Sequence, residues 1–476
     1  MRFFGRVIAL REGKSFMRKY ILIFLYILFS PPTYAFDPYS NTELDTIKKE
    51  YLEEINRSPQ VIRNPMAVEK INAIGKKLAQ AGEVPFASFF IVNSDEMNAF
   101  AGPGGYIGIH SSLIAATDNE DELAAVMAHE LAHVKLHHLY DMIEHEKLMK
   151  IPTAASMLAA IALGMLNPAL GTGAMAATLA GGAQQSINYT RYHERQADRI
   201  GMQMLQKAGY NPIAMANFFQ KLQNQSRYYA RDNIPAILLT HPLDQERIAE
   251  VENRLPKKPN PVFNNNLDFQ LFKTIIRVAS TKDPKVLLDY YTNAKDTPAN
   301  RYGLALTLLD TNRFTEAYNK LLPLVDQNPN HPFITISLAD AEIGKHDNTE
   351  AINTLIKLHQ AYPEMQAVML ALAQAYLATN QADKGAMLLT KAFRQEPHNL
   401  TICKSLAKAE AQNKREAYAY FTEGQCDHLQ GHDNVAILRL KTALKLVKND
   451  NYLKARIEAK LEEIRFLAQF SQRKKS

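Results

Sequence analysis

The stretch MAHELAHVKLHH, Met127–His138, places a His-Glu-x-x-His motif inside a segment with helical periodicity. Together with the preceding DNEDELAAV it has apolar side chains at every third or fourth position, and Asp118 or Asn119 can cap its first turn. On such a helix His129 and His133 leave the same face one turn apart, so both imidazoles can bind one ion. The stretch therefore predicts a helix that carries half of a metal site.

Helix geometry separates the other polar residues of this stretch. Glu130 lies ~100° around the helix from His129, close enough to act as a base without ligating the ion. His137 is eight residues beyond His129, which is about 12 Å along the axis and too far for a shared ion. We expect His137, His138 and the later His145 to be exposed or packing residues.

A third ligand must come from another element, and the segment Tyr189–Pro212 is the best candidate. It is predicted to be helical to about Ala208 and carries Glu194 and Asp198 one turn apart. Glu194 can bind the ion, while Asp198 can accept the far N–H of a ligating histidine. His193 is a rival ligand but lies ~100° from the face of Glu194. Solvated charges on an amphipathic helix are the alternative interpretation.

Four motifs carry a resemblance to a known family. HELAH from His129 and ERQAD from Glu194 are preceded by NAFAGPGGYIGIHSSLI from Asn98 and followed by LLTHPLDQER from Leu238. Over roughly residues 44 to 255 the chain resembles the M48 family of zinc metallopeptidases. The resemblance implies a zincin-like domain of helices plus a small β-sheet that binds one Zn²⁺ per chain. The implied zinc ligands are His129, His133 and Glu194, with Glu130 as catalytic base and Asp198 as orienting acid.

The segment GGYIGIH, Gly104–His110, is predicted to be a strand that follows a Gly-Pro-Gly-Gly turn. By resemblance to the family it is the active-site edge, along which an extended substrate adds as a further strand. The residues expected to bind substrate are Asn98, Gly105, Tyr106, Ile107 and Gly108.

His241 precedes a proline in a predicted loop, with Arg247 six residues further on. His241 can stabilise the oxyanion, or it can occupy the open zinc position as a fourth ligand that keeps the enzyme silent until substrate arrives. Arg247 is grouped with His241 in this regulatory or oxyanion-stabilising role. A plain surface histidine is the alternative.

The first 35 residues are predicted to be a cleavable signal peptide. Arg18 and Lys19 precede the apolar run Tyr20–Ser30, and small residues stand at Thr33 and Ala35. The run is short for a bilayer span, which needs ~20 residues, and an uncleaved anchor is the alternative. We therefore expect an exported chain whose peptidase domain covers residues 36–255.

A second apolar segment, residues 151–187, contains no charged side chain and lies between the two halves of the predicted site. Asn167 and Pro168 divide it into pieces that are too short to span a membrane. It is either a buried helical hairpin or an exposed one that touches a membrane surface or a hydrophobic client.

The C-terminal part of the chain is repetitive. Three prolines within residues 256–262 predict a linker, and residues 263–476 follow it. There one constant interval, the period of tetratricopeptide repeats, relates three sets of positions: Pro329, Pro363 and Pro397; Ala305, Ala339 and Ala373; Ala317, Ala351 and Gly385. We expect the register to slip after these units, with an irregular helix around Thr401–Ala411. The fold class is thus mainly α: a metallopeptidase domain followed by an α-solenoid, which either binds a partner on its concave face or is a structural cap.

Cysteine content and charge add limited information. Cys403 and Cys426 fit an oxidising compartment, either as a disulfide or as two separate thiols. The formal net charge of +6 is modest for 476 residues, and the absence of a basic cluster interleaved with aromatic residues argues against nucleic acid as a partner.

An export signal, an M48-like site and a repeat array together resemble a periplasmic M48 protease of Gram-negative bacteria. The resemblance implies an endopeptidase associated with the outer membrane that cleaves misfolded or stalled β-barrel outer-membrane proteins. It also implies the outer-membrane β-barrel assembly machinery as a partner. The alternative is a chaperone-like assembly factor whose repeats bind envelope proteins and whose proteolysis is secondary.

Overall fold

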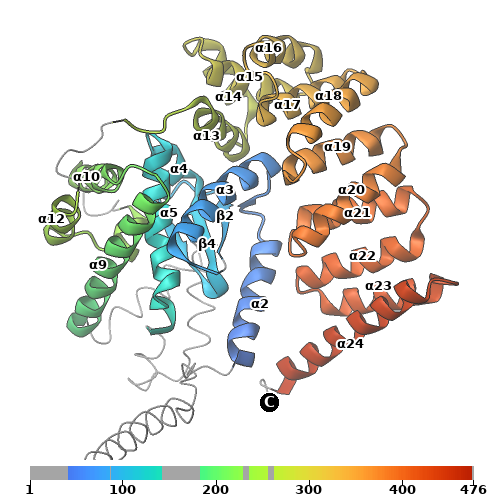
Figure 1. Cartoon of the computed structure of the whole chain (residues 1–476), viewed down its shortest axis with the longest axis horizontal. Coiled ribbons are helices and arrows are strands. Elements are labelled where there is room, and N and C mark those ends of the chain that lie inside the picture. The colour runs from blue at the N-terminus through green and yellow to red at the C-terminus, as the bar shows by residue number, and fades with distance from the viewer. Residues whose placement is uncertain (1–40, 86, 142–182, 229–234, 256–261, 474–476) are drawn as a thin grey trace, which may run out of the picture. The chain divides into compact units, whose positions relative to one another are not determined.

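The computed structural model describes residues 41–85, 87–141, 183–228, 235–255 and 262–473 (Figure 1). The chain divides into two units, residues 1–46 and 47–476, and the contacts described below lie within the second. The expected leader at 1–35 lies outside the described residues, as do most of the apolar segment 151–187 and most of the linker 256–262. Within the described ranges, no helix is both long enough and apolar enough to cross a membrane.

The described residues are mainly helical, with one four-stranded sheet, so the predicted fold class is confirmed. Helices of the N-terminal part are α2 (Asn41–Arg57), α3 (Pro65–Gly82), α4 (Ser111–Ala116), α5 (Glu120–Lys135), α9 (Ala183–Lys207), α10 (Ile213–Tyr228), α11 (Ala236–Thr240) and α12 (Gln245–Asn253). The strands are β1 (Val61–Ile62), β2 (Ser88–Val92), β3 (Ala99–Ala101) and β4 (Tyr106–His110), and the short 3₁₀ helix η1 (Pro103–Gly105) joins the last two.

The sheet has the strand order β1-β2-β4-β3, which makes β4 a central strand. It pairs with β2 in parallel, from Ser88 opposite Tyr106 onward, and with β3 in antiparallel, with Phe100 opposite Gly108. All five residues of β4 are buried. The prediction that Gly104–His110 forms the substrate edge is therefore wrong, because both sides of β4 already have backbone partners. The edge strand in contact with α5 is β3.

Helix α5 begins as its sequence predicts and ends earlier. The Asn119 side chain accepts a hydrogen bond from the Glu122 backbone N–H at 3.0 Å, and the Glu122 carboxylate accepts one from the Asp118 N–H at 2.8 Å. The pair is a variant of the capping box, because Glu122 accepts from the residue before the N-cap Asn119 and not from the N-cap itself. The helix stops at Lys135, and His137 takes a left-handed φ of 57°. His137 and His138 thus lie beyond the helix that was expected to carry them.

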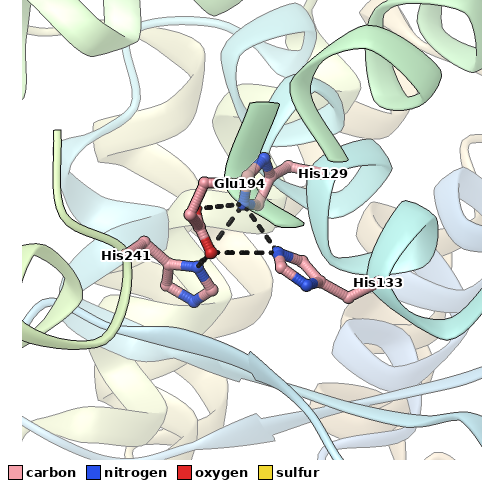
Figure 2. Close-up of side chains that lie close together, drawn as sticks. All are labelled: His129, His133, Glu194 and His241. Atoms are coloured by element: carbon pink, nitrogen blue, oxygen red, sulfur yellow. Dashed lines mark hydrogen bonds and ion pairs between the residues drawn. The ribbon is translucent and has the colours of Figure 1, made fainter. Parts of the chain in front are cut away.

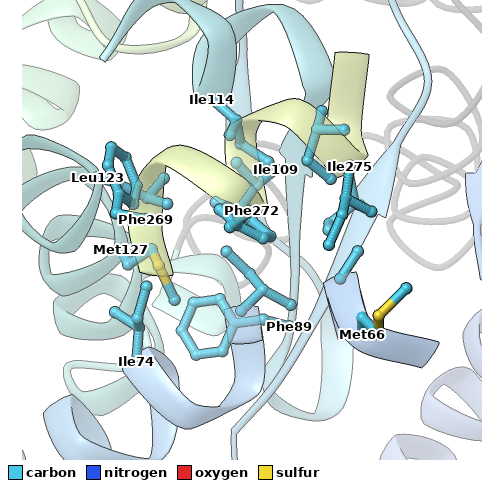
Figure 3. Packing of buried hydrophobic residues seen from close by; sticks show 14 of the residues in the cluster. Met66, Ile74, Phe89, Ile109, Ile114, Leu123, Met127, Phe269, Phe272 and Ile275 are labelled. Atoms are coloured by element: carbon cyan, nitrogen blue, oxygen red, sulfur yellow. The ribbon is translucent and has the colours of Figure 1, made fainter. Parts of the chain in front are cut away.

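The hydrophobic core lies between the sheet and the helices around it (Figure 3). Phe89 and Ile109 come from the sheet, and Met127 comes from α5. Phe269 and Phe272 of α13 (Leu267–Ser280) join the same cluster and are fully buried. The core therefore includes the first helix after the predicted linker, and α13 packs against α4 and α3.

The remaining described helices follow one another through the C-terminal part of the chain. They are α14 (Pro284–Asn293), α15 (Pro298–Asp310), α16 (Phe314–Gln327), α17 (Pro332–Gly344), α18 (Asn348–Ala361), α19 (Gln366–Ala378), α20 (Ala382–Gln395), α21 (Leu400–Gln412), α22 (Glu416–Leu429), α23 (Asp433–Leu446) and α24 (Asn451–Arg473). Consecutive neighbours from α15 to α24 pack against one another.

The repeat register continues further than predicted. The first helices of four pairs begin at positions 298, 332, 366 and 400, and the second helices at 314, 348, 382 and 416. Both series keep the interval of the three predicted units, so the predicted slip and irregular helix after the third unit are wrong. Ala407 and Ala419 keep the small-residue positions and are buried. A disulfide between Cys403 and Cys426, whose Cα atoms lie 5.8 Å apart, joins α21 to α22 and settles the open question about these thiols.

Candidate metal centre

Four side chains from three parts of the chain converge on one point (Figure 2). His129 and His133 come from α5, Glu194 comes from α9, and His241 follows α11 directly. One nitrogen or oxygen from each lies within 4.8 Å of all the others. The Nε2 atoms of His129 and His133 lie 3.1 Å apart, and they lie 3.2 Å and 3.4 Å, respectively, from the Glu194 carboxylate. Nδ1 of His241 lies 3.0 Å from the same carboxylate.

This donor set fits a tetrahedral metal ion such as zinc. Four ligands at about 2.0–2.1 Å from a central ion stand about 3.3–3.4 Å apart. The donor atoms here lie 3.0–3.4 Å from their near neighbours, through one or the other oxygen of Glu194, and all within 4.8 Å of one another. Imidazole nitrogens and a carboxylate oxygen are donors that zinc accepts. The arrangement of His129, His133, Glu194 and His241 could therefore hold a metal ion.

A close crossing of α5 and α9 brings Glu194 to the two histidines of α5. The crossing is made at Gly201 of α9, where an added Cβ would lie 3.0 Å from the carbonyl oxygen of Ala128 and 3.1 Å from Cα of His129. These neighbours are backbone atoms and cannot rotate away. The absence of a side chain at residue 201 therefore sets the distance between the two helices that carry the site.

Asp198 and Arg247 lie on the side of the cluster away from the convergence point. Oδ1 of Asp198 lies 2.9 Å from Nδ1 of His129, so Nε2 of that ring faces the other donors. Arg247, only 2% exposed, donates two hydrogen bonds of 2.8 Å to the Asp198 carboxylate. Its third nitrogen donates to the carbonyl oxygen of Pro242 and lies 3.0 Å from Glu194.

The guanidinium of Arg247 is therefore fully engaged in holding acids and a carbonyl. All three of its nitrogens have partners within the protein. These contacts favour a positioning role for Arg247 over the predicted oxyanion-stabilising or regulatory one, and we propose that role. It fixes Asp198 and Glu194 and ties the chain after His241 to them.

The charges of the cluster stabilise one another despite deep burial. Burial opposes ionisation of Glu194, but His241, His133 and His129 outweigh it and hold the pKa of this carboxyl well below its usual range. Burial likewise lowers the pKa of His129, but Asp198 and Glu194 dominate and raise it to about 10. The two buried carboxyls, Glu194 and Asp198, are thus kept ionised by the cationic groups that face them.

Glu130 is placed to act on a group bound beside the cluster. It is 1% exposed, and its Oε1 lies 3.5 Å from Nε2 of His241. Its Oε2 is buried and has no hydrogen-bond partner within the described ranges of the chain. A buried carboxylate oxygen without a partner is costly unless a ligand supplies one. Glu130 therefore has an oxygen available for a water or a substrate.

A small apolar cavity adjoins Glu130 and His241. Its volume is about 30 Å³, in the measure on which one water needs about 10–15 Å³. The apolar side chains that line it are Ala125, Val126, Met215, Phe218, Phe219, Leu222, Ile237 and Leu243. The cavity can take the end of a branched aliphatic side chain beside the metal-binding cluster.

The residues predicted to bind substrate do not line the cluster as a group. Gly105 lies in η1, and Tyr106, Ile107 and Gly108 belong to the buried central strand β4. Asn98 precedes the edge strand β3, and its side-chain oxygen accepts hydrogen bonds from the Ala99 N–H at 3.0 Å and the Thr240 hydroxyl at 3.3 Å. Asn98 thus ties the edge strand to α11, which delivers His241.

His138 is a residue that sequence reasoning set aside and that the structure places at the site. It is 5% exposed, and its Nδ1 lies 3.0 Å from Nδ1 of His133. His193, the rival ligand, stacks on His138 with ring centroids 4.1 Å apart and is not part of the cluster. His137 is exposed, and His145 lies outside the described residues. His138 could have been found only by predicting that the helix ends at Lys135. No residue of the stretch clearly marks that end.

The fold and the site lie in a segment that resembles a known peptidase family. Residues 65–255 match the model of peptidase family M48. The matched segment contains α3, the strands β2, β3 and β4, and all four residues of the cluster.

The chain is also similar to named proteases of bacteria and mitochondria. The chain is 37% identical over 305 residues to the β-barrel assembly-enhancing protease of Escherichia coli (strain K12), a match that covers 62% of this chain and 62% of that protein. The protein of that name from Yersinia pestis is 36% identical over 306 residues, with 62% of each chain covered. A mitochondrial metalloendopeptidase of Saccharomyces cerevisiae is 30% identical over 162 residues, which is 34% of this chain and 44% of that one. The match thus spans less than two thirds of the length of the bacterial relatives.

Two solved structures of tetratricopeptide repeat proteins are similar to parts of the chain. One from Thermus thermophilus is 19% identical, covers 40% of this chain and 92% of its own, and has a TM-score of 0.25. One from Parabacteroides merdae is 15% identical, covers 51% of this chain and 98% of its own, and has a TM-score of 0.29.

Proposed function

We propose that the chain is a zinc-dependent endopeptidase of the periplasm that acts in the assembly and quality control of outer-membrane proteins. The observation that carries the peptidase assignment is the convergence of four donor atoms within 4.8 Å beside the buried carboxylate of Glu130. His129, His133 and Glu194 are the proposed zinc ligands. The relatives' name, which refers to β-barrel assembly, supports misfolded or stalled β-barrel proteins as substrates.

The proposed chemistry is hydrolysis of a peptide bond by water. Zinc held by these ligands would supply Lewis acidity toward the carbonyl and toward the water. Glu130 takes the proton of the attacking water and returns it to the leaving nitrogen, using the buried oxygen that has no partner in the described chain. Asp198 keeps Nδ1 of His129 protonated, so that Nε2 remains a donor to the ion.

The proposed substrate is an extended or unfolded polypeptide. Since β4 is central, the strand available for such a segment is the edge strand β3, which contacts α5. A polypeptide that adds there as a strand would run past Glu130, and an aliphatic side chain next to the cut bond would enter the adjoining cavity. Folded barrels have no free segment of this kind, which favours unassembled clients.

His241 is the proposed fourth ligand of a resting state. Its Nδ1 faces Glu194 at 3.0 Å and lies 3.4 Å from Nε2 of His129, so it points into the cluster. Its side chain is 15% exposed, which argues against a plain surface histidine. In this position it would occupy the place that substrate and water need. Activation then requires the segment that follows α11 to move.

The partner and the location belong to the same proposal. The predicted signal peptide and the disulfide between Cys403 and Cys426 both fit an oxidising envelope compartment. The repeat helices α15 to α24 offer a solenoid surface for the β-barrel assembly machinery or for clients. The proposed site of any membrane-surface contact is the apolar segment 151–187.

Replacing Glu130 by Gln in a strain that lacks its own copy of the gene separates the two functions. The substitution keeps the ligands and removes the base. If cleavage is the essential activity, Glu130→Gln fails to restore outer-membrane protein assembly, while the wild-type chain restores it. Full restoration by Glu130→Gln would instead favour the chaperone-like factor.

A further inference from the structure

We infer that His138 is a positioning residue that holds His133 in the one tautomer able to bind the metal. This inference rests on the metal site proposed above. It concerns a histidine outside the donor set, which contacts a proposed ligand from the side opposite the cluster. Three residues carry it: His133, His138 and Gln196.

The three side chains form a chain of contacts. Nδ1 of His138 lies 3.0 Å from Nδ1 of His133, and Nε2 of His138 lies 3.1 Å from Oε1 of Gln196. The amide nitrogen of Gln196 donates to the hydroxyl of Tyr192 at 2.9 Å, and its amide oxygen faces His138. The ring of His138 is also fixed in plane by its stack on His193, with an interplanar angle of 12°.

The direction of each hydrogen bond follows from Gln196, which ends the chain of contacts on the side away from His133. An amide oxygen only accepts, so Nε2 of His138 carries a hydrogen and donates it to Gln196. A neutral imidazole has a single N–H, which leaves Nδ1 of His138 as an acceptor. The proton between the two Nδ1 atoms therefore belongs to His133.

The same position of the proton follows from His133, whose Nε2 would bind the metal. A ligating Nε2 of His133 has no hydrogen, so the single N–H of that ring must be at Nδ1. That N–H needs an acceptor, and Nδ1 of His138 lies at hydrogen-bond distance from it. Both ends of the chain of contacts thus require one pattern of protons.

The two proposed histidine ligands are consequently supported in different ways. Nδ1 of His129 faces an anion, Asp198, at 2.9 Å, whereas Nδ1 of His133 faces a neutral ring. The turn at His137, with its φ of 57°, is what returns the chain so that His138 lies against His133. The end of α5 at Lys135 is therefore what allows His138 to contact a proposed metal ligand.

Zinc affinity of the purified chain, measured by competition with a chromophoric chelator, tests this role without relying on catalysis. His138→Leu removes the acceptor and should weaken zinc binding about 10- to 100-fold, the usual effect of losing such a supporting hydrogen bond. His138→Asn places an amide oxygen near the former Nδ1 and should stay within a few-fold of wild type. Gln196→Leu should fall between the two, because it only frees the tautomer of His138.

His137→Leu is the matched control, since His137 is the neighbouring histidine and is exposed. It should bind zinc like the wild type. Equal losses in His138→Leu and His138→Asn would show that the ring matters for packing alone and would overturn the inference. So would wild-type affinity in His138→Leu. A wild-type chain that binds no zinc would refute the metal site itself and the inference with it, a result distinct from the other two.

Discussion

Nδ1 of His241 lies 3.0 Å from Oε1 of Glu194, although the two residues are 47 positions apart in the chain. The contact closes the fourth side of a cluster whose other members come from α5 and α9. The end of α11 is also held by Arg247, six residues after His241. Arg247 donates hydrogen bonds to the Asp198 carboxylate and to the carbonyl oxygen of Pro242. The segment that would block the site is thus anchored to the acids that build it.

Replacing His241 by Ala should increase the hydrolysis of an unfolded protein substrate several-fold. The substitution removes the proposed fourth ligand and leaves His129, His133 and Glu194 in place. Zinc affinity should fall at the same time, because one donor is lost. Peptidase assays and chelator competition measure the two effects. A loss of activity by a factor of about 100, the effect of removing one oxyanion donor, would show instead that His241 assists the reaction.

Replacing Gly201 by Ala should disrupt metal binding more than folding. The added methyl group would lie 3.0 Å from the backbone of α5, so the helices must separate by a few tenths of an ångström. Overpacking costs about 1–3 kcal/mol, and the gain in helix propensity of about 1 kcal/mol offsets part of it. Metal–ligand distances tolerate only about 0.2 Å.

Zinc affinity of Gly201→Ala should therefore drop at least about tenfold, while thermal unfolding of the metal-free protein changes little. Gly209→Ala is a poor control because Gly209 has a φ of 75°. Gly385→Ala, in the repeat helix α20, is a better one, since that glycine is also buried in a helix and lies far from the donors in sequence. Unchanged zinc affinity in Gly201→Ala would contradict the proposed role of the crossing.

The stability of the repeat region should depend on pH through Glu410. Burial raises the pKa of this carboxyl to about 7, and the Thr422 hydroxyl donates a 2.6 Å hydrogen bond to it. The raised folded-state pKa means that the folded chain holds a proton which the unfolded chain releases. Stability is therefore lost as the pH rises from about 4.5 to about 7 and stays low above that range.

Glu410→Gln removes this titration and should stabilise the chain by on the order of 1–3 kcal/mol at pH 8, with little effect at pH 4.5. Denaturant unfolding at the two pH values measures the difference. Glu416→Gln, at an exposed position of α22, is the control and should show no such pH dependence. An equal effect of Glu410→Gln at both pH values would contradict the prediction.

The apolar cavity should select the residue on the leaving-amine side of the cut bond, because Glu130 lines it. Wild-type protein should cut an unfolded substrate mainly before valine, leucine or isoleucine, as mapped by mass spectrometry of the products. Phe218→Leu enlarges the cavity and should shift the cuts toward larger side chains. Phe272→Leu makes the same change in the core away from the cavity and should leave the pattern as it was. Identical patterns in all three proteins would exclude this role for the cavity.

Local periodicity in the sequence was sufficient to predict the helical parts of the site. The i, i+4 spacings of His129 with His133 and of Glu194 with Asp198 each require only one helix. The position of β4 could not be predicted in this way, because strand order depends on partners that are distant in sequence. His138 was missed because the helix was expected to continue past Lys135.

The fourth repeat was missed for a different reason. Ala407 and Ala419 follow Ala373 and Gly385 by one full repeat, so the small-residue signal was present. The closing proline was absent, since Gly431 stands at the position one repeat after Pro397. The packing of paired helices depends on the small buried residues, and a change in the connecting turn does not break the register.

The central claim is that Glu130 acts as the base beside a metal ion bound by His129, His133 and Glu194. Metal content and hydrolysis of an unfolded protein substrate, measured together on the wild type and Glu130→Gln, test it most directly. If Glu130 is the base, both proteins contain one zinc per chain and only Glu130→Gln loses hydrolysis. A wild-type chain without zinc, or a Glu130→Gln chain that hydrolyses substrate at the wild-type rate, would contradict it.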